Sequence, residues 1–298
     1  MQNLPIIILH ELKVLLRTQR ALGVSIIYLS LAVLGGLLYV YAVASIEKNG
    51  LLLMQSQGMS PEQAAQSLDL MGEEAYGQIL AFLAEANVAE LAPSLLRSPI
   101  LPAFLWATLF FLPALIVLAG YDQISGELAG RSLCYRSLRT SRATLLLGKV
   151  AAQFILFVVL LSVSAATLVF TAAAKLETLN IADTLLGLLR LWGLLLPVGA
   201  CYIAFTALGS SVSARGENAL VFIVGLLFGL RLLHVTRHFS TDGPFAIFYP
   251  LHWLSPRGYE YGLWLDGPTA PMMSAAAYLG LAALALTAAY ALLRKHNL

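Results

Sequence analysis

Residues 121–149 read YDQISGELAGRSLCYRSLRTSRATLLLGK, and the rest of the chain is organised around this polar stretch. It carries seven charged side chains, although only 11% of all residues are charged. Apolar sequence long enough to cross a bilayer flanks it on both sides. Seven charges in one stretch are stable only in water. The stretch is therefore expected to lie outside the membrane, between two membrane spans. We call residues 121–149 the handle.

The composition indicates an integral membrane protein. The chain has 298 residues, 59% of them hydrophobic, and a mean hydropathy of +0.80. Apolar runs of about 20 residues recur, and each can span the hydrocarbon layer as a helix. A soluble helical protein would need a polar face at helical spacing, which residues 145–174 and 272–293 lack. The runs are continuous rather than alternating, so a transmembrane β-barrel is disfavoured as well.

The predicted fold is therefore all-α, with six membrane-spanning helices. They are expected at 21–46, 100–120, 145–174, 184–208, 219–233 and 272–293. Residues 4–20 precede them and form an apolar helical face beside a basic one, which is typical of an elbow helix lying in the membrane interface. The alternative is a basic flank to the first span. Glu11, Lys13 and Arg17 are the residues of interest in the elbow helix.

Three polar segments connect the predicted spans. Residues 47–98 are expected to form a helical insert, because Ser60 and Gln63 fit a capping box around Pro61. This insert is expected to lie outside the cytoplasm. Residues 121–144 are expected to form the polar connecting segment at the start of the handle. Residues 239–270 contain four prolines and are predicted to be an irregular, aromatic outer segment.

The distribution of basic residues sets the predicted orientation. An even number of spans places both termini on one side, and that side holds eleven Lys and Arg residues against six on the other. Cytoplasmic loops carry the excess of such residues, so both termini and the handle are expected in the cytosol.

No motif indicates an enzyme or a bound metal. Gly148-Lys149 lacks the other residues of a phosphate-binding loop, no GxSxG is present, and Cys134 and Cys201 form no CxxC pair. No bound cofactor, metal or nucleic acid is expected. Arg190 is the one charged residue placed well inside a predicted span, about two turns from its outer end, and is expected either to snorkel or hydrogen-bond to a neighbouring helix, or to face a substrate. None of the predicted spans contains a carboxylate that could relay protons, which disfavours an ion-driven carrier. The energy for transport is therefore expected from a partner.

The handle resembles the cytosolic segment between the second and third spans of type-2 ABC transporter permeases. That segment has the pattern D-x-I-x-x-E, then G-T-L, P-x-S-R and L-x-G-K, and the matching residues here are Tyr121, Asp122, Ile124, Gly126, Glu127, Leu133, Ser141, Arg142, Leu147, Gly148 and Lys149. The chain looks closest to the multi-copper enzyme maturation branch, similar to the nitrous-oxide-reductase accessory permease. Arg131-Ser132-Leu133 replaces G-T-L and the proline before Ser141 is missing, so a more polar contact is expected.

The resemblance implies a permease subunit of an ABC exporter in the bacterial cytoplasmic membrane. It implies a homodimer with two separate ABC ATPase subunits, which would hold the ATP and Mg²⁺ that this chain does not bind. The handle would be the coupling helix that docks on the ATPase, through Asp122, Glu127, Arg131, Arg136, Arg139, Arg142 and Lys149. Asp122 and Glu127 are expected to pair with Arg139, Arg142 or Lys149 and stiffen the turn; the alternative is solvated charges. Glu11 and Arg17 are second candidates for the ATPase contact.

The outer side offers a possible pathway or gate, at Arg190, Arg231, His234 and His252. Arg231, His234 and His238 fall at helical spacing, and aromatic residues surround His252. The alternatives are an aromatic belt at the membrane interface, or copper ligation by the histidines. Two other functions remain open: a membrane subunit that acts mechanically on an outer partner through the 47–98 insert, and an ATP-independent carrier or channel. The transported substrate is not defined by the sequence.

Overall fold

The computed structural model describes residues 4–60, 62–63, 67, 98, 100–130, 140–176, 179–238 and 246–295. Most of the predicted 47–98 insert lies outside these residues. So do Arg131, Arg136 and Arg139 of the handle, for which the predicted ATPase contact stays a prediction.

Six helices among the described residues are long and apolar enough to cross a membrane, as expected from the sequence. They are α2 (Gln19–Ser56), α5 (Ile100–Gly120), α8 (Arg142–Lys175), α9 (Ile181–Val212), α10 (Gly216–Leu233) and α12 (Thr269–Lys295). A further helix, α1 (Leu4–Arg17), precedes α2, and a short helix, α6 (Ser125–Ala129), follows α5 within the handle. The all-α membrane fold is therefore confirmed.

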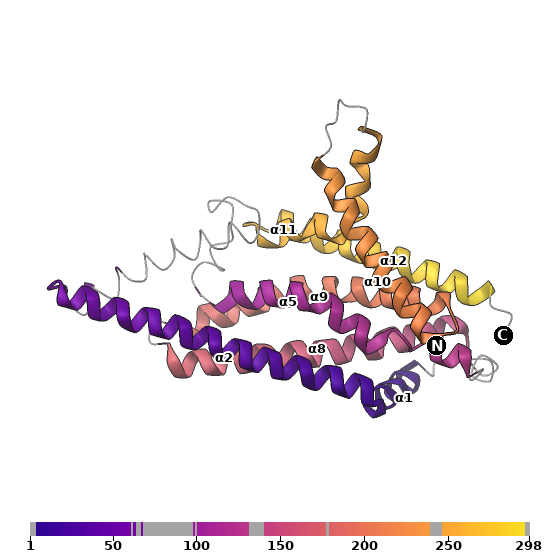
Figure 1. Ribbon diagram of the computed structural model, residues 1–298, viewed down its shortest axis with the longest axis horizontal. Coiled ribbons are helices and arrows are strands. Elements are labelled where there is room, and N and C mark those ends of the chain that lie inside the picture. Colours follow the sequence, from indigo (N-terminus) through magenta and orange to yellow (C-terminus); the bar gives the residue numbers. More distant parts are fainter. Residues whose placement is uncertain are drawn as a thin grey trace.

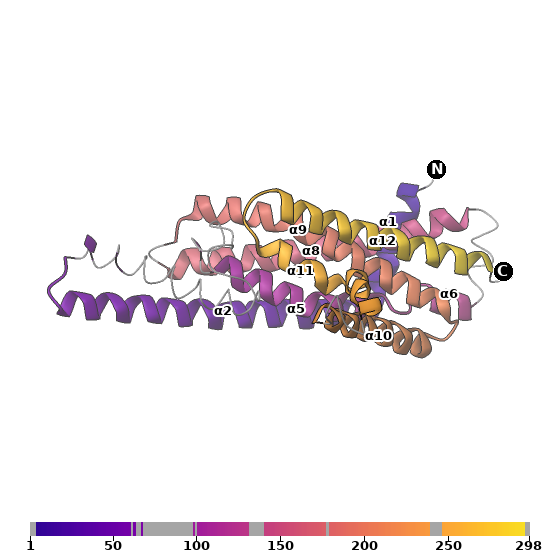
Figure 2. The same cartoon turned by 90° about the horizontal axis from the view of Figure 1, so that it is seen from above.

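Five of the long helices run along the long axis of the molecule, while α10 leaves the bundle at an angle (Figure 1). Both chain ends lie at the end of the bundle that holds α6, and α1 crosses the direction of the long helices there (Figure 2). The handle and the two termini are thus on the same side of the molecule. This is the side that the excess of basic residues predicts to be cytosolic.

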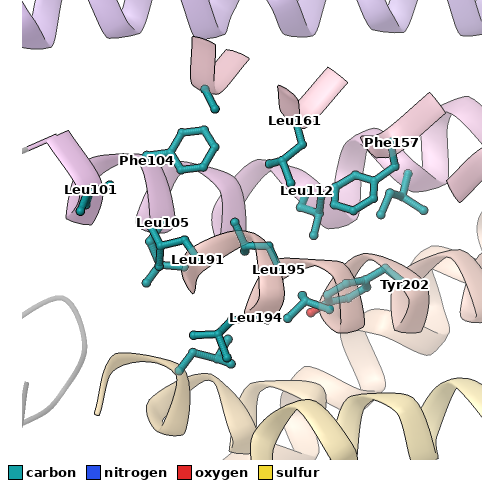
Figure 3. Packing of buried hydrophobic residues seen from close by; sticks show 14 of the residues in the cluster. Leu101, Phe104, Leu105, Leu112, Phe157, Leu161, Leu191, Leu194, Leu195 and Tyr202 are labelled. Carbon is teal, nitrogen blue, oxygen red and sulfur yellow. The ribbon is translucent and has the colours of Figure 1, made fainter. Parts of the chain in front are cut away.

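Helix α9 is the centre of the bundle. Within its apolar stretch 67% of residues are buried, compared with 11% in α2 and in α10. Leucines of α9, among them Leu195, share one buried cluster with Leu105 of α5 and Leu161 of α8 (Figure 3). Gly187 of α9 allows a close approach of α5, because a Cβ there would lie 2.2 Å from Leu101 Cδ1.

Helix α2 is longer than the span predicted at 21–46. It continues through Glu47 and Lys48 to Ser56, and its 38 residues span about 57 Å at 1.5 Å each. This exceeds the roughly 30 Å of a hydrocarbon layer. The charges end the apolar span but leave the helix intact, since no proline interrupts it. The capping box is confirmed, because Ser60 N donates to Gln63 Oε1 (3.4 Å) and Gln63 N donates to Ser60 Oγ (3.3 Å).

The outer segment is more regular than predicted. It contains the 3₁₀ helices η3 (Ala246–Leu254) and η4 (Pro256–Tyr259) and the short helix α11 (Glu260–Trp264). Before it, α10 ends at Leu233 and continues as the 3₁₀ helix η2 (His234–His238). A 3₁₀ helix has three residues per turn, so the α-helical spacing assumed from Arg231 to His238 ends at Leu233, and a shared face of Arg231, His234 and His238 stays a prediction. Prolines here open or tighten turns rather than exclude helix.

Candidate coupling site at the handle

The described start of the handle contains the short helix α6, and the N-terminus of α6 is anchored to α9. The buried hydroxyl of Ser210 accepts hydrogen bonds from Ile124 N (3.0 Å) and Ser125 N (3.1 Å). The first N–H groups of a helix have no partner within the helix, so Ser210 supplies the missing acceptor from another helix. Helix α6 is thus fixed to the most buried helix of the bundle.

Lys149 joins three elements of the chain. Its Nζ lies 2.8 Å from Oε2 of Glu11 in α1 and 2.9 Å from Oε1 of Glu127 in α6. The side chains of Lys149 and Glu11 are 4% and 3% exposed, and that of Glu127 is 16% exposed. A buried ammonium is stable only when it is paired, and charge-assisted hydrogen bonds are the stronger kind. We call Glu11, Glu127 and Lys149 the ion triad.

Gly148 lets α1 approach α8 next to the ion triad. A Cβ at Gly148 would lie 2.5 Å from Ile7 Cγ2, closer than any side chain allows. Leu15 of α1 also packs with Ala21 and Leu156 in a small apolar cluster. The Gly148-Lys149 pair is therefore the surface of α8 on which α1 packs.

Arg142 ties the start of α8 to the end of α12. Its Nη1 donates to Leu293 O (2.8 Å) and Arg294 O (3.2 Å). The last carbonyls of a helix lack partners within it and carry partial negative charge, so a guanidinium is a favourable cap. Ser141 caps the same end of α8, since its Oγ accepts from Thr144 N (3.2 Å). A small cavity between these ends is lined by Ile124, Arg142, Leu145, Leu146, Lys149 and Leu293.

The predicted coupling residues therefore fall into two groups. Glu127, Arg142 and Lys149 are brought together by packing, and Lys149 is the one of the three expected cations whose pairing with Glu127 is confirmed. Asp122 lies beside the start of α10, where a Cβ at Gly216 would be 3.4 Å from its Cβ. Lys13 and Arg17 are exposed on α1.

The outer gate stays a prediction, and the residues predicted for it lie on four elements, Arg190 on α9, Arg231 on α10, His234 on η2 and His252 on η3. Arg190 Nη2 donates to Leu265 O (3.0 Å), at the end of α11, which agrees with its expected hydrogen-bonding role. His252 is buried between the rings of Tyr249 and Trp253, with both centroids 4.7 Å away. No group of three or more His, Cys, Asp or Glu able to hold a metal occurs among the described residues.

Two polar residues of this site escaped the sequence analysis. Ser210 lies beyond the span predicted at 184–208, but it belongs to α9 and is fully buried. Gln153 of α8 donates from Nε2 to Ile116 O (2.8 Å), and Gly120 makes room, because a Cβ there would lie 2.3 Å from Gln153 Nε2. A lone amide within an apolar span was the available signal for Gln153.

Comparison with known proteins agrees with this architecture. The model of a protein family described as ABC-2 family transporter protein matches residues 6–295, nearly the whole chain. No curated protein matches the sequence. The branch within the family stays a prediction. With six apolar helices, a handle between the second and third of them and a family match over its length, the chain belongs to the ABC-2 transporter family as the membrane-spanning permease subunit of an ABC transporter.

Proposed function

We propose that this permease is the membrane half of an ATP-driven exporter that switches access across the membrane when its ATPase partners close. The observation that carries the proposal is the ion triad, because Lys149 holds α6 of the handle, α1 and the membrane-spanning helix α8 in one unit. A partner that pushes on the handle would therefore move a span rather than bend a loop.

The contacts at the handle lead to two further spans. Ser210 attaches α6 to α9, and Arg142 attaches the start of α8 to the end of α12. At the opposite end, the same two spans hold the outer segment. Arg190 of α9 donates to Leu265 O, and Tyr278 of α12 donates from its hydroxyl to Pro256 O (2.9 Å). Rigid-body movement of packed helices is a common way to carry motion between two sites.

We further propose that two copies act together with two ATPase subunits, in the bacterial cytoplasmic membrane and with both termini cytosolic. The exposure of α10 supports a partner for this helix. Val221 is 72% exposed and Phe228 is 62% exposed, and the helix stands away from the bundle (Figure 1). A second copy of α10 would cover such a face, and a pair of chains would match the two-site closure of ABC ATPases.

The experiment that tests the proposal measures ATP hydrolysis by the partner ATPase in proteoliposomes with and without the permease. Glu127→Lys places a cation against Lys149 and should abolish the permease-dependent part of the turnover. Asp266→Lys makes the same charge change at an exposed position of the outer segment and serves as the matched control. Turnover that never depends on the permease, or that responds equally to both substitutions, would refute the proposal.

A second candidate is mechanical action on a partner outside the cytoplasm. It is favoured by α2, which runs beyond the other helices at the end opposite the termini (Figure 2) and exposes Leu52 (56%) and Leu53 (64%) there. Deletion of residues 62–97 distinguishes the two. An exporter keeps substrate-stimulated ATP turnover after the deletion, whereas a mechanical subunit keeps ATP turnover but loses its outer partner.

A further inference from the structure

The orientation of α1 about its own axis is fixed by the contacts at α8. Glu11 is clamped by Lys149, Ile7 sits over Gly148, and Leu15 is buried against Leu156. Residues 7, 11 and 15 recur every four positions and so form one buried face. These contacts prevent α1 from rotating about its axis. The residues on its opposite side therefore face outward in a fixed arrangement.

The outward side of α1 combines an apolar strip with a basic strip. Leu9 is 68% exposed and Leu16 is 45% exposed, and their spacing of seven positions places both on the same strip. Lys13 and Arg17, four residues apart and both exposed, form the neighbouring strip. At about 100° per residue, the two strips lie side by side on the side away from Glu11.

The apolar strip continues from α1 into the first turns of α2. Leu22, Ile26 and Ile27 are 43%, 61% and 60% exposed, and they belong to the apolar stretch that begins a membrane span. Helix α1 crosses the direction of the spans at the end where this stretch begins (Figure 2), a position that suits a helix lying along the edge of the hydrocarbon layer. This continuity favours lipid over a protein as the material that covers α1.

We propose that Lys13 and Arg17 form a binding site for anionic lipid headgroups, with the acyl chains against Leu9 and Leu16. Lysine and arginine side chains near a membrane attract anionic lipids, and long stems let their charges reach the headgroups. The site lies within two turns of Glu11, so a bound headgroup restrains the helix that holds Lys149. The inference rests on the proposed function only for placing α1 at the cytosolic leaflet. It adds to the coupling site a bound lipid that steadies the helix carrying Glu11.

The test measures lipid binding by the full-length permease alone, so its result does not depend on any ATPase. The purified chain in neutral detergent is titrated with phosphatidylglycerol or phosphatidylcholine, and native mass spectrometry gives the dissociation constant of the first bound lipid. The variants are Lys13→Gln with Arg17→Gln, and a control that removes the same charge elsewhere, Lys48→Gln with Arg215→Gln. Melting in phosphatidylcholine shows that each variant is folded.

Wild-type protein and control should prefer phosphatidylglycerol, and the α1 double variant should lose most of that preference. Each cation is worth about fivefold in affinity, so the combined loss is up to roughly 25-fold, and the single variants should each lose about fivefold. Raising the salt to about 1 M should remove the preference as well, because screening then acts over about 3 Å. Equal affinity of the wild type for both lipids, or an equal loss in the control, would overturn the proposal. Because the measurement uses no ATPase, a negative result would refute the lipid site and would not bear on the proposed ATP-driven export.

Discussion

Replacing Lys149 with methionine tests the ion triad most severely. Methionine comes close to lysine in length but removes the ammonium that Glu11 and Glu127 share. Glu11 is 3% exposed, so its carboxylate cannot recover the lost interaction from water. Breaking a buried ion pair by removing one partner costs about 3–5 kcal/mol. For a chain of this size, such a loss lowers the melting temperature by roughly 6–20 °C.

The assay is thermal melting of the detergent-purified permease, followed by tryptophan fluorescence. A second variant, in which Glu11, Glu127 and Lys149 are all methionine, separates charge imbalance from lost packing. A buried ionic cluster replaced entirely by apolar residues is often as stable as the original, so the triple variant should melt within a few degrees of wild type. Glu217→Met, at an exposed position, serves as the control for a surface carboxylate.

The reasoning would be refuted by a Lys149→Met variant that melts at the wild-type temperature. It would also be refuted if the triple variant were less stable than Lys149→Met, because the loss would then come from packing rather than from unpaired carboxylates.

Three further predictions concern single contacts. Gly148→Ala should lower the free energy of unfolding by about 1–3 kcal/mol, because its new Cβ would lie 2.5 Å from Ile7 Cγ2. Its control is Gly280→Ala, whose new Cβ meets nothing within 4 Å, and which should be neutral or stabilising by up to about 1 kcal/mol. Thermal melting compares the two variants. Ser210→Ala leaves two buried N–H groups without an acceptor, so it should cost about 1–3 kcal/mol and accelerate amide exchange in α6; unchanged exchange would contradict the anchoring of the handle. Tyr278→Phe removes the donor to Pro256 O and should cost about 1 kcal/mol, with faster amide exchange confined to the outer segment; an effect at the handle instead would contradict the assignment.

The six spans could be predicted because hydrophobic length is a local property of the sequence. The ends of the helices could not, since Glu47 and Lys48 mark where an apolar span ends and not where α2 ends. In the outer segment the prolines suggested irregular chain, yet Pro256 opens a 3₁₀ helix, where its missing N–H has no role.

The candidate site was predictable in its residue types but not in its pairings. The local pattern left Glu127 with three possible cations, and its observed ion pair with Lys149 depends on how α8 is placed against α6. Glu11 and Lys149 are 138 residues apart, and no spacing rule links residues across such a distance. Arg142 was expected to face the ATPase through its charge, but its guanidinium caps the end of α12, a role that depends on where the last helix ends.

The central claim is that an ATPase pushes on the handle, and site-specific photo-crosslinking tests it most directly. A photoreactive amino acid is placed at Ala129, the exposed end of α6, and, as the control, at Leu53, at the opposite end of the molecule. Irradiation of membranes that contain the whole complex should join the permease to the ATPase from Ala129 and not from Leu53. An ATPase adduct that is absent from Ala129, or that forms equally from Leu53, would contradict the account.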